Sequence, residues 1–110
     1  MKKQLRKLSQ RAYQRELEKA LSSLNQKFNS WQNKEIDCWT LNELIHEYHD
    51  KTQRDLYKRF VMSTDHAFMI AEALHKKTLT ENEIPTSVMG EIDRLLKFIK
   101  EDHNSIDKSD

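Results

Sequence analysis

The 110-residue sequence contains only one cysteine, one glycine and one proline. A many-stranded sandwich or barrel needs turn residues about every 8–12 positions, so their scarcity excludes such a fold. The same glycine count excludes collagen-like segments, low-complexity linkers and a glycine-rich phosphate loop. A single cysteine cannot form an internal disulfide, which is typical of a reducing compartment, and we expect a cytoplasmic protein.

Long apolar runs are also missing. No stretch approaches the roughly 18 apolar residues of a membrane-spanning helix, so we expect no membrane association. The basic start Met1-Lys2-Lys3 is followed by Arg6 and Lys7 rather than by the apolar segment of a signal peptide. The length of the chain predicts a single domain.

What the sequence does contain is apolar residues at intervals of three and four, the spacing of one helix face. They predict an all-α fold, a small antiparallel bundle of about four helices in one domain over residues 1–102. The expected helices cover about residues 3–33, 40–62, 65–77 and 85–102, and residues 103–110 are expected to be a disordered tail. The first helix would be about 45 Å long and needs a partner along its length.

The start of the second helix is predicted from a capping box. In the pattern Thr-x-x-Glu, Thr40 and Glu43 each satisfy the other's free backbone N–H. Trp39 and Leu44 stand at the positions of a hydrophobic staple across this start. On this interpretation, Thr40→Ala destabilises the protein by about 1 kcal/mol.

A second capping-box pattern, Thr80 with Glu83, precedes Pro85, which suits the first turn of the last helix. Gly90 lies inside that helix, where glycine costs about 1 kcal/mol relative to alanine. We therefore expect either a close crossing of another helix at Gly90 or a helix that starts near it.

The first helix has two apolar stripes. Leu5, Leu8 and Ala12 form an early one, and the step from Leu8 to Tyr13 is out of phase with it. The first three turns are therefore expected to face differently from the rest of the helix, or to fray. The main stripe, which we expect to form a dimer interface, consists of Tyr13, Leu17, Leu21, Leu24, Phe28 and Trp31.

Charge is unevenly distributed, because residues 1–34 carry a net charge of +7 and residues 35–110 a net charge of −6. We expect a homodimer formed through the first helix, in which a two-fold arrangement pairs the opposite charges head against tail. The basic residues Lys3, Lys7, Arg11 and Arg15 provide the alternative, an accessory nucleic-acid-binding protein that contacts phosphates.

Candidate metal ligands are few. His46, His49 and Asp50 lie close together on one helix and could hold Zn²⁺ or Ni²⁺ weakly at the surface. Two Glu-x-x-His pairs, Glu43/His46 and Glu72/His75, resemble the ligand spacing of di-metal bundles, and they raise a third alternative, a metal-dependent helical enzyme.

The only candidate nucleophile is Cys38, and the carboxylate of the adjacent Asp37 disfavours the thiolate that nucleophilic catalysis requires. We therefore expect no catalytic residue, no cofactor and no bound metal. The sequence favours a small intracellular interaction or regulatory protein that acts through protein–protein contacts, with a second copy of the chain as the expected partner.

Overall fold

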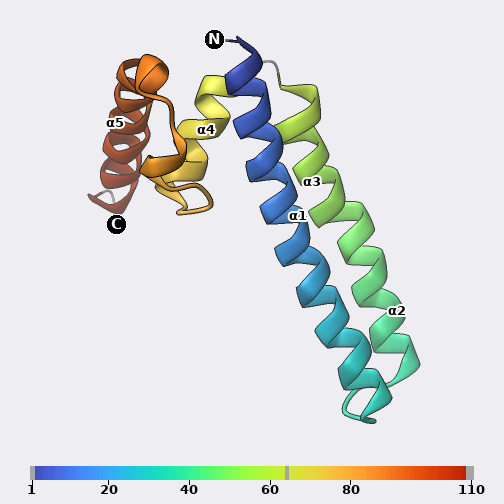
Figure 1. Cartoon of the computed structure of the whole chain (residues 1–110). Coiled ribbons are helices and arrows are strands. Elements are labelled where there is room, and N and C mark those ends of the chain that lie inside the picture. The colour runs from blue at the N-terminus through green and yellow to red at the C-terminus, as the bar shows by residue number, and fades with distance from the viewer. Residues whose placement is uncertain (1, 64, 109–110) are drawn as a thin grey trace. The chain divides into compact units, whose positions relative to one another are not determined.

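The computed structural model describes the backbone of residues 2–63 and 65–108 and the side chains of residues 3–63 and 65–101. Within these ranges the chain consists of helices and their connections, with no strand, so the predicted all-α class is confirmed (Figure 1). In chain order the elements are α1 (Lys2–Gln32), α2 (Cys38–Glu47), η1 (Tyr48–Gln53), α3 (Arg54–Tyr57), η2 (Lys58–Met62), α4 (His66–His75), η3 (Glu81–Glu83) and α5 (Thr86–Lys108).

The second expected helix forms as one helical stretch over residues 38–62, in which α2 and α3 alternate with the π-helical η1 and η2. A π-helix pairs residue i with i+5 and turns less per residue than an α-helix. Tyr48, Leu56 and Phe60 are separated by multiples of four, and in a regular α-helix this spacing drifts by about 120° over the 12 residues. The π-helical turns reduce that drift, and Leu56 and Phe60 are both buried.

This helical stretch begins at Cys38, so the predicted start at Thr40 is wrong. Asp37 is the N-cap, and its Oδ1 accepts a hydrogen bond of 2.8 Å from the backbone N–H of Thr40. Hydrogen bonds from the backbone and side chain of Thr40 hold the pKa of Asp37 below its ordinary value. The predicted staple is wrong as well, because the side chain of Trp39 is 77% exposed.

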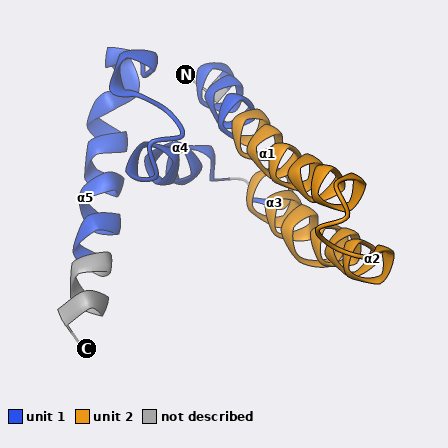
Figure 2. Cartoon of the chain, turned by 90° about the horizontal axis from the view of Figure 1, so that it is seen from below, with its two compact units in different colours: residues 1–12, 63–110 blue, residues 13–62 orange. Residues whose placement is uncertain are grey.

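The chain divides into two compact units, residues 1–12 with 63–110 and residues 13–62, drawn in different colours in Figure 2. The division within α1 coincides with the change of phase in its apolar stripe. Leu8 and Ala12 are buried and belong to the first unit, whereas Tyr13 belongs to the second, in which it contacts Phe60. The sequence predicts that the first turns of α1 either fray or face differently from the rest of the helix. They are helical, and their buried residues belong to a different unit from Tyr13.

The unit of residues 1–12 and 63–110 has an apolar core in which α4 packs against α5. Asp65 caps α4 by accepting a hydrogen bond of 3.0 Å from the N–H of Phe68, and Arg11 forms an ion pair of 3.1 Å with Glu83. The buried apolar side chains of this unit are Leu8, Ala12, Ala67, Met69, Ile70, Ala71, Ala73, Leu79, Ile84, Val88, Ile92 and Ile99.

The last helix differs from its prediction in two respects. Before this helix, the predicted capping box of Thr80 and Glu83 is present, and it opens only the short 3₁₀ helix η3 because Pro85 follows two residues after Glu83. Gly90 is in the first part of α5 with nothing within 4 Å of a Cβ built there, so both expectations for Gly90 are wrong. α5 also extends to Lys108, past the expected end near residue 102, and residues 109 and 110 lie outside the described part of the chain.

Candidate interaction surface

Residues 13–62 form a helical hairpin, in which the part of α1 from Tyr13 onward runs antiparallel to residues 38–62 (Figure 1). We call the end with residues 33–37 the loop end and the opposite end the base. Among the described residues of the hairpin, the buried apolar side chains are Leu41, Leu56 and Phe60. A two-helix unit with so small a core leaves much of its apolar surface without a partner.

The base of the hairpin is closed by aromatic and charged side chains. Tyr13 stacks on Phe60 with ring centroids 5.2 Å apart, and the guanidinium of Arg59 lies 5.2 Å from the centroid of the Phe60 ring. Arg59 donates hydrogen bonds of 2.9 Å to Glu16 and 3.1 Å to Asp55. Partial burial by itself lowers the pKa of Arg59, but its bonds and charge interactions with Glu16 and Asp55 outweigh this and raise it.

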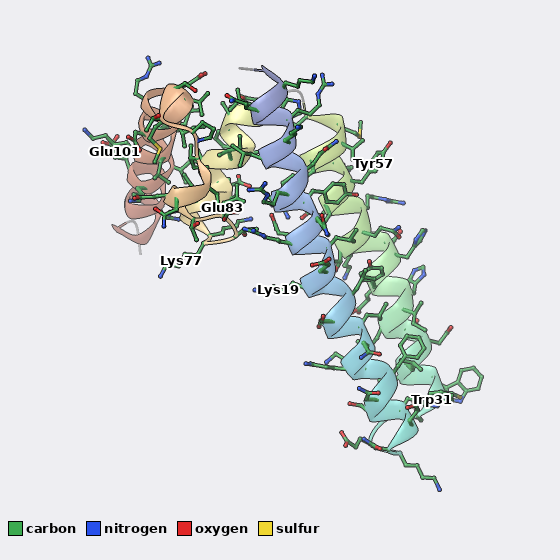
Figure 3. The ribbon with its side chains drawn as sticks, viewed as in Figure 1. Lys19, Trp31, Tyr57, Lys77, Glu83 and Glu101 are labelled. Carbon is green, nitrogen blue, oxygen red and sulfur yellow. The ribbon has the colours of Figure 1, made fainter. Side chains whose placement is uncertain are left out.

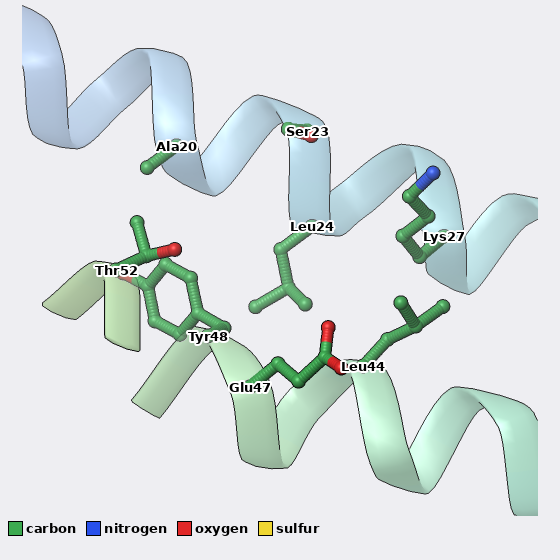
Figure 4. Close-up of a pocket in the computed structure, with 8 residues that line it drawn as sticks. All are labelled: Ala20, Ser23, Leu24, Lys27, Leu44, Glu47, Tyr48 and Thr52. Atoms are coloured by element: carbon green, nitrogen blue, oxygen red, sulfur yellow. The ribbon is translucent and has the colours of Figure 1, made fainter. Parts of the chain in front are cut away.

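Nearer the loop end, an open groove with a volume of about 250 Å³ lies between α1 and the α2–η1 segment (Figure 4). It combines apolar side chains with the hydroxyls of Ser23 and Thr52, and with Lys27 and Glu47. Its lining residues are Ala20, Ser23, Leu24, Lys27, Leu44, Glu47, Tyr48 and Thr52. The groove lies on one side of the hairpin, because both of its helices contribute lining residues there.

The structure divides the predicted dimer stripe of α1 into two parts. Tyr13, Leu17 and Leu24 are half-buried within the hairpin, whereas Leu21 is 46%, Phe28 37% and Trp31 42% exposed. The three exposed residues lie on the same helix as the others, so spacing alone does not separate the two parts. An uncovered apolar strip along α1 is therefore the principal candidate for an interaction surface.

The loop end carries exposed apolar side chains, of which Trp31 belongs to the predicted stripe of α1 and Trp39 does not. Trp31 lies at this end of the hairpin (Figure 3), and Trp39 is the most exposed of the large apolar residues in the described part of the chain. Toward the base of the hairpin, Tyr57, Val61 and Met62 are about half or more exposed. No periodic signal distinguishes these residues, because each lies off its helix's main stripe or at a helix end.

The four basic residues considered for nucleic-acid binding are all exposed, but they are not equivalent. Arg11 is already paired with Glu83, and Arg15 also has an interaction within the chain. Lys3 and Lys7 lie on the first two turns of α1. The basic strip therefore presents fewer unengaged charges than its sequence indicates.

Of the candidate metal ligands, His46 lies in α2, and His49 and Asp50 lie in η1, where they make local contacts. His49 Nδ1 lies 2.8 Å from Gln53 Oε1, and Asp50 forms an ion pair of 3.4 Å with Arg54. In the described residues, no three or more His, Cys, Asp or Glu side chains are grouped so that they could hold a metal ion. Of the Glu-x-x-His pairs, Glu72 forms an ion pair of 3.8 Å with Lys76.

Comparisons with known proteins do not add to this picture, because no family model, curated protein or solved structure matches the chain. Over the residues that the structure describes, no helix combines the length and apolar character needed to cross a membrane. Cys38 is an exposed free thiol at the start of α2, and its neighbour Asp37 is engaged as the helix cap.

Proposed function

We propose that this protein acts through protein–protein contacts made by the helical hairpin, and that its partner is a second copy of the chain. The observation that carries the proposal is the exposure of Leu21 and Phe28 on a helix whose stripe residues Tyr13, Leu17 and Leu24 are half-buried within the hairpin. Burial of apolar area supplies most of the affinity of such contacts. The lone, exposed Cys38 favours an intracellular setting, in which thiols stay reduced.

A second copy is the partner that the charge pattern of the hairpin supports. Residues 13–62 contain eight Lys and Arg and eight Asp and Glu, so the hairpin as a whole has no net charge. The signs occur in blocks, however, with five acidic and no basic residues in 35–50 and four basic and one acidic in 51–62. A copy of the same surface offers both signs, which a uniformly charged partner does not.

The test is the mass of the full chain in solution, measured by light scattering across micromolar concentrations. We expect a dimer for the native chain and a monomer for the double variant Leu21→Asp, Phe28→Asp, because each change places a carboxylate in the uncovered apolar strip. Leu17 and Leu24 are less suitable, since both are half-buried within the hairpin.

A matched control for the single change Phe28→Asp is Gln26→Asp, which adds the same charge at an exposed position about 160° around α1 from Phe28. This variant should remain a dimer. A strictly monomeric native chain at high micromolar concentration would contradict the proposal, and a 260/280 nm absorbance ratio that shows bound nucleic acid would then favour the basic residues Lys3 and Lys7 as the working surface.

A further inference from the structure

We propose that the two hairpins pack with their α1 helices side by side and antiparallel, about a two-fold axis near residues 22 and 23. The loop ends of the two copies then point in opposite directions. This arrangement rests on the proposed self-association and adds to it an orientation, a register and the side of the hairpin that is used.

The side is identified by the groove. Ser23 and Glu47 both line it, one from each helix of the hairpin. At about 100° per residue, Leu21 lies about 160° around α1 from Ser23, and Ile45 lies about 160° around α2 from Glu47. Leu21 and Ile45 therefore face the side opposite the groove. Phe28, about 20° from Leu21, faces the same side, which we call the apolar side.

The register follows from the spacing of the α1 residues on and beside this side. Leu17, Leu21, Leu24 and Phe28 are separated by four, three and four residues, so the series reads the same in both directions. Two antiparallel copies centred between residues 22 and 23 place Leu21 beside the partner's Leu24, and Leu17 beside the partner's Phe28. The exposed Leu21 and Phe28 then lie level with the half-buried Leu24 and Leu17 of the other copy, of which Leu24 also lines the groove.

The margin of this strip is compatible with a second α1 helix. Gln14, Glu18, Asn25 and Gln32 lie about 20–60° from Leu21, on the flank away from α2, and all four are exposed. Gln14 donates a hydrogen bond of 3.2 Å to Glu18. Over residues 13–32 of α1 this flank contains no lysine or arginine, so an antiparallel copy brings amides beside a single carboxylate from each chain and no large like-charged cluster forms.

The acidic and basic blocks also match in this orientation. Antiparallel hairpins place residues 35–50 of one copy alongside residues 51–62 of the other, which pairs a net charge of −5 with one of +3. None of the ion pairs in the described part of the chain uses Glu43, Glu47, Lys51 or Lys58, so these charges are not already paired. Such exposed charges mainly orient the two copies.

A second two-fold orientation, with both loop ends together, does not pair the acidic block of one copy with the basic block of the other, and it is less favourable for the apolar residues. It places α1 of one copy beside α2 of the other. On its apolar side α2 presents Cys38, Asn42, Ile45 and, continuing into η1, His49, of which Ile45 is the large aliphatic residue. Leu21 and Phe28 find more apolar surface on the partner's α1, and apolar burial therefore selects the antiparallel pairing.

The two orientations differ in the distance between the two copies of Cys38, which lies at the loop end. In the antiparallel pairing, the two Gln32 residues are about 30 Å apart along the helix axis, from a rise of 1.5 Å per residue. Spin labels on the native Cys38 of the full-length chain should therefore be separated by about 30 Å or more. With the loop ends together, the labels lie within about 20 Å, since packed helix axes are 8–10 Å apart.

A second probe near the axis separates the possible failures. In a Cys38→Ser background, Ser22→Cys places the label at an exposed position of α1, and the antiparallel pairing predicts a separation of about 20 Å or less. A long Cys38 distance with a short residue-22 distance supports the inference. Short distances at both positions overturn the orientation while leaving the dimer intact, whereas a monomeric mass with no dipolar coupling at either position overturns the dimer itself.

Discussion

Tyr13 and Phe60 stack with ring centroids 5.2 Å apart and ring planes 4° from parallel. They are separated by 47 positions in the sequence, and they join α1 to η2 at the base of the hairpin. Phe60 is buried, and it is one of few such residues in the hairpin. This contact therefore contributes an unusually large share of the interactions that hold the two helices together.

The stack predicts a measurable coupling between Tyr13 and Phe60. Tyr13→Leu and Phe60→Leu should each lower the free energy of unfolding, and the double variant should lose less than the sum of the two. Aromatic pairs contribute about 0.5–1.5 kcal/mol beyond their area burial, which is the coupling expected from a double-mutant cycle. Urea denaturation of the four proteins at one concentration measures it, and strictly additive losses would show that the rings do not interact.

The cap of α2 gives a prediction that differs from the sequence-based one. Asp37→Ala should lower the denaturation midpoint more than Thr40→Ala, because Asp37 supplies the capping oxygen and the backbone N–H of Thr40 remains in the alanine variant. Asp37→Asn keeps a capping oxygen and should lie close to the native chain. If Thr40→Ala is the more damaging of the two alanine variants, the helix begins at Thr40 after all.

The same cap predicts a dependence on pH. The pKa of Asp37 is held below its ordinary value of 3.8, so its charge stabilises the fold fully above that value. As the pH falls through the lowered pKa, this contribution is lost. The difference in denaturation midpoint between the native chain and Asp37→Asn should therefore shrink below about pH 3.8 and be unchanged between pH 5 and 8.

Gly90 predicts a stabilising substitution. It lies inside α5, and a Cβ added there meets no atom within 4 Å. Gly90→Ala should raise the free energy of unfolding by about 1 kcal/mol, since alanine removes backbone freedom from the unfolded chain and is the better helix former. Thermal unfolding followed by circular dichroism measures the shift. Ser87→Ala, at another exposed position of the first turns of α5, shows how much of it a general gain in helix propensity explains.

Much of the helical layout follows from local sequence patterns. Spacing and capping chemistry predict the long first helix, the break between residues 62 and 66 and the capping box of Thr80 with Glu83. The out-of-phase step between Leu8 and Tyr13 also had a structural meaning, because the two compact units divide at residues 12 and 13. Such features depend on neighbours within a few positions, and a single sequence contains those.

The remaining features depend on contacts that local patterns do not contain. Two capping residues, Asp37 and Thr40, stand within one turn, and the backbone geometry of the preceding loop decides between them. The π-helical turns, which reduce the drift of the apolar residues of one helix around its axis, have no counterpart in the local sequence pattern. Likewise, the division of the α1 stripe into half-buried Leu17 and Leu24 and exposed Leu21 and Phe28 depends on where the second helix packs.

The ion pair of Arg59 with Glu16 is a further contact of this kind, and it predicts an asymmetry between its two partners. Arg59 Nη2 lies 2.9 Å from Glu16 Oε1, and both side chains are about four-fifths buried. Arg59 has a second acidic partner, since its Nε lies 3.1 Å from Asp55 Oδ2, whereas Arg59 is the basic partner of Glu16 in the described part of the chain.

Arg59→Gln should therefore destabilise the protein more than Glu16→Gln. The first change leaves a largely buried carboxylate without its cation, which costs about 1–3 kcal/mol, while the second leaves Arg59 bound to Asp55 and costs under about 1 kcal/mol.

Because the pKa of Arg59 is raised, its charge is complete at every pH below its ordinary value, and titration of Arg59 adds no pH dependence to this difference between pH 6 and 9. Urea denaturation at both pH values checks the order, and Arg59→Lys, which keeps the charge without the planar fork, should fall between the native chain and Arg59→Gln. Equal losses for Arg59→Gln and Glu16→Gln would mean that Glu16 finds another partner or water, and that the pair does not fix the base of the hairpin.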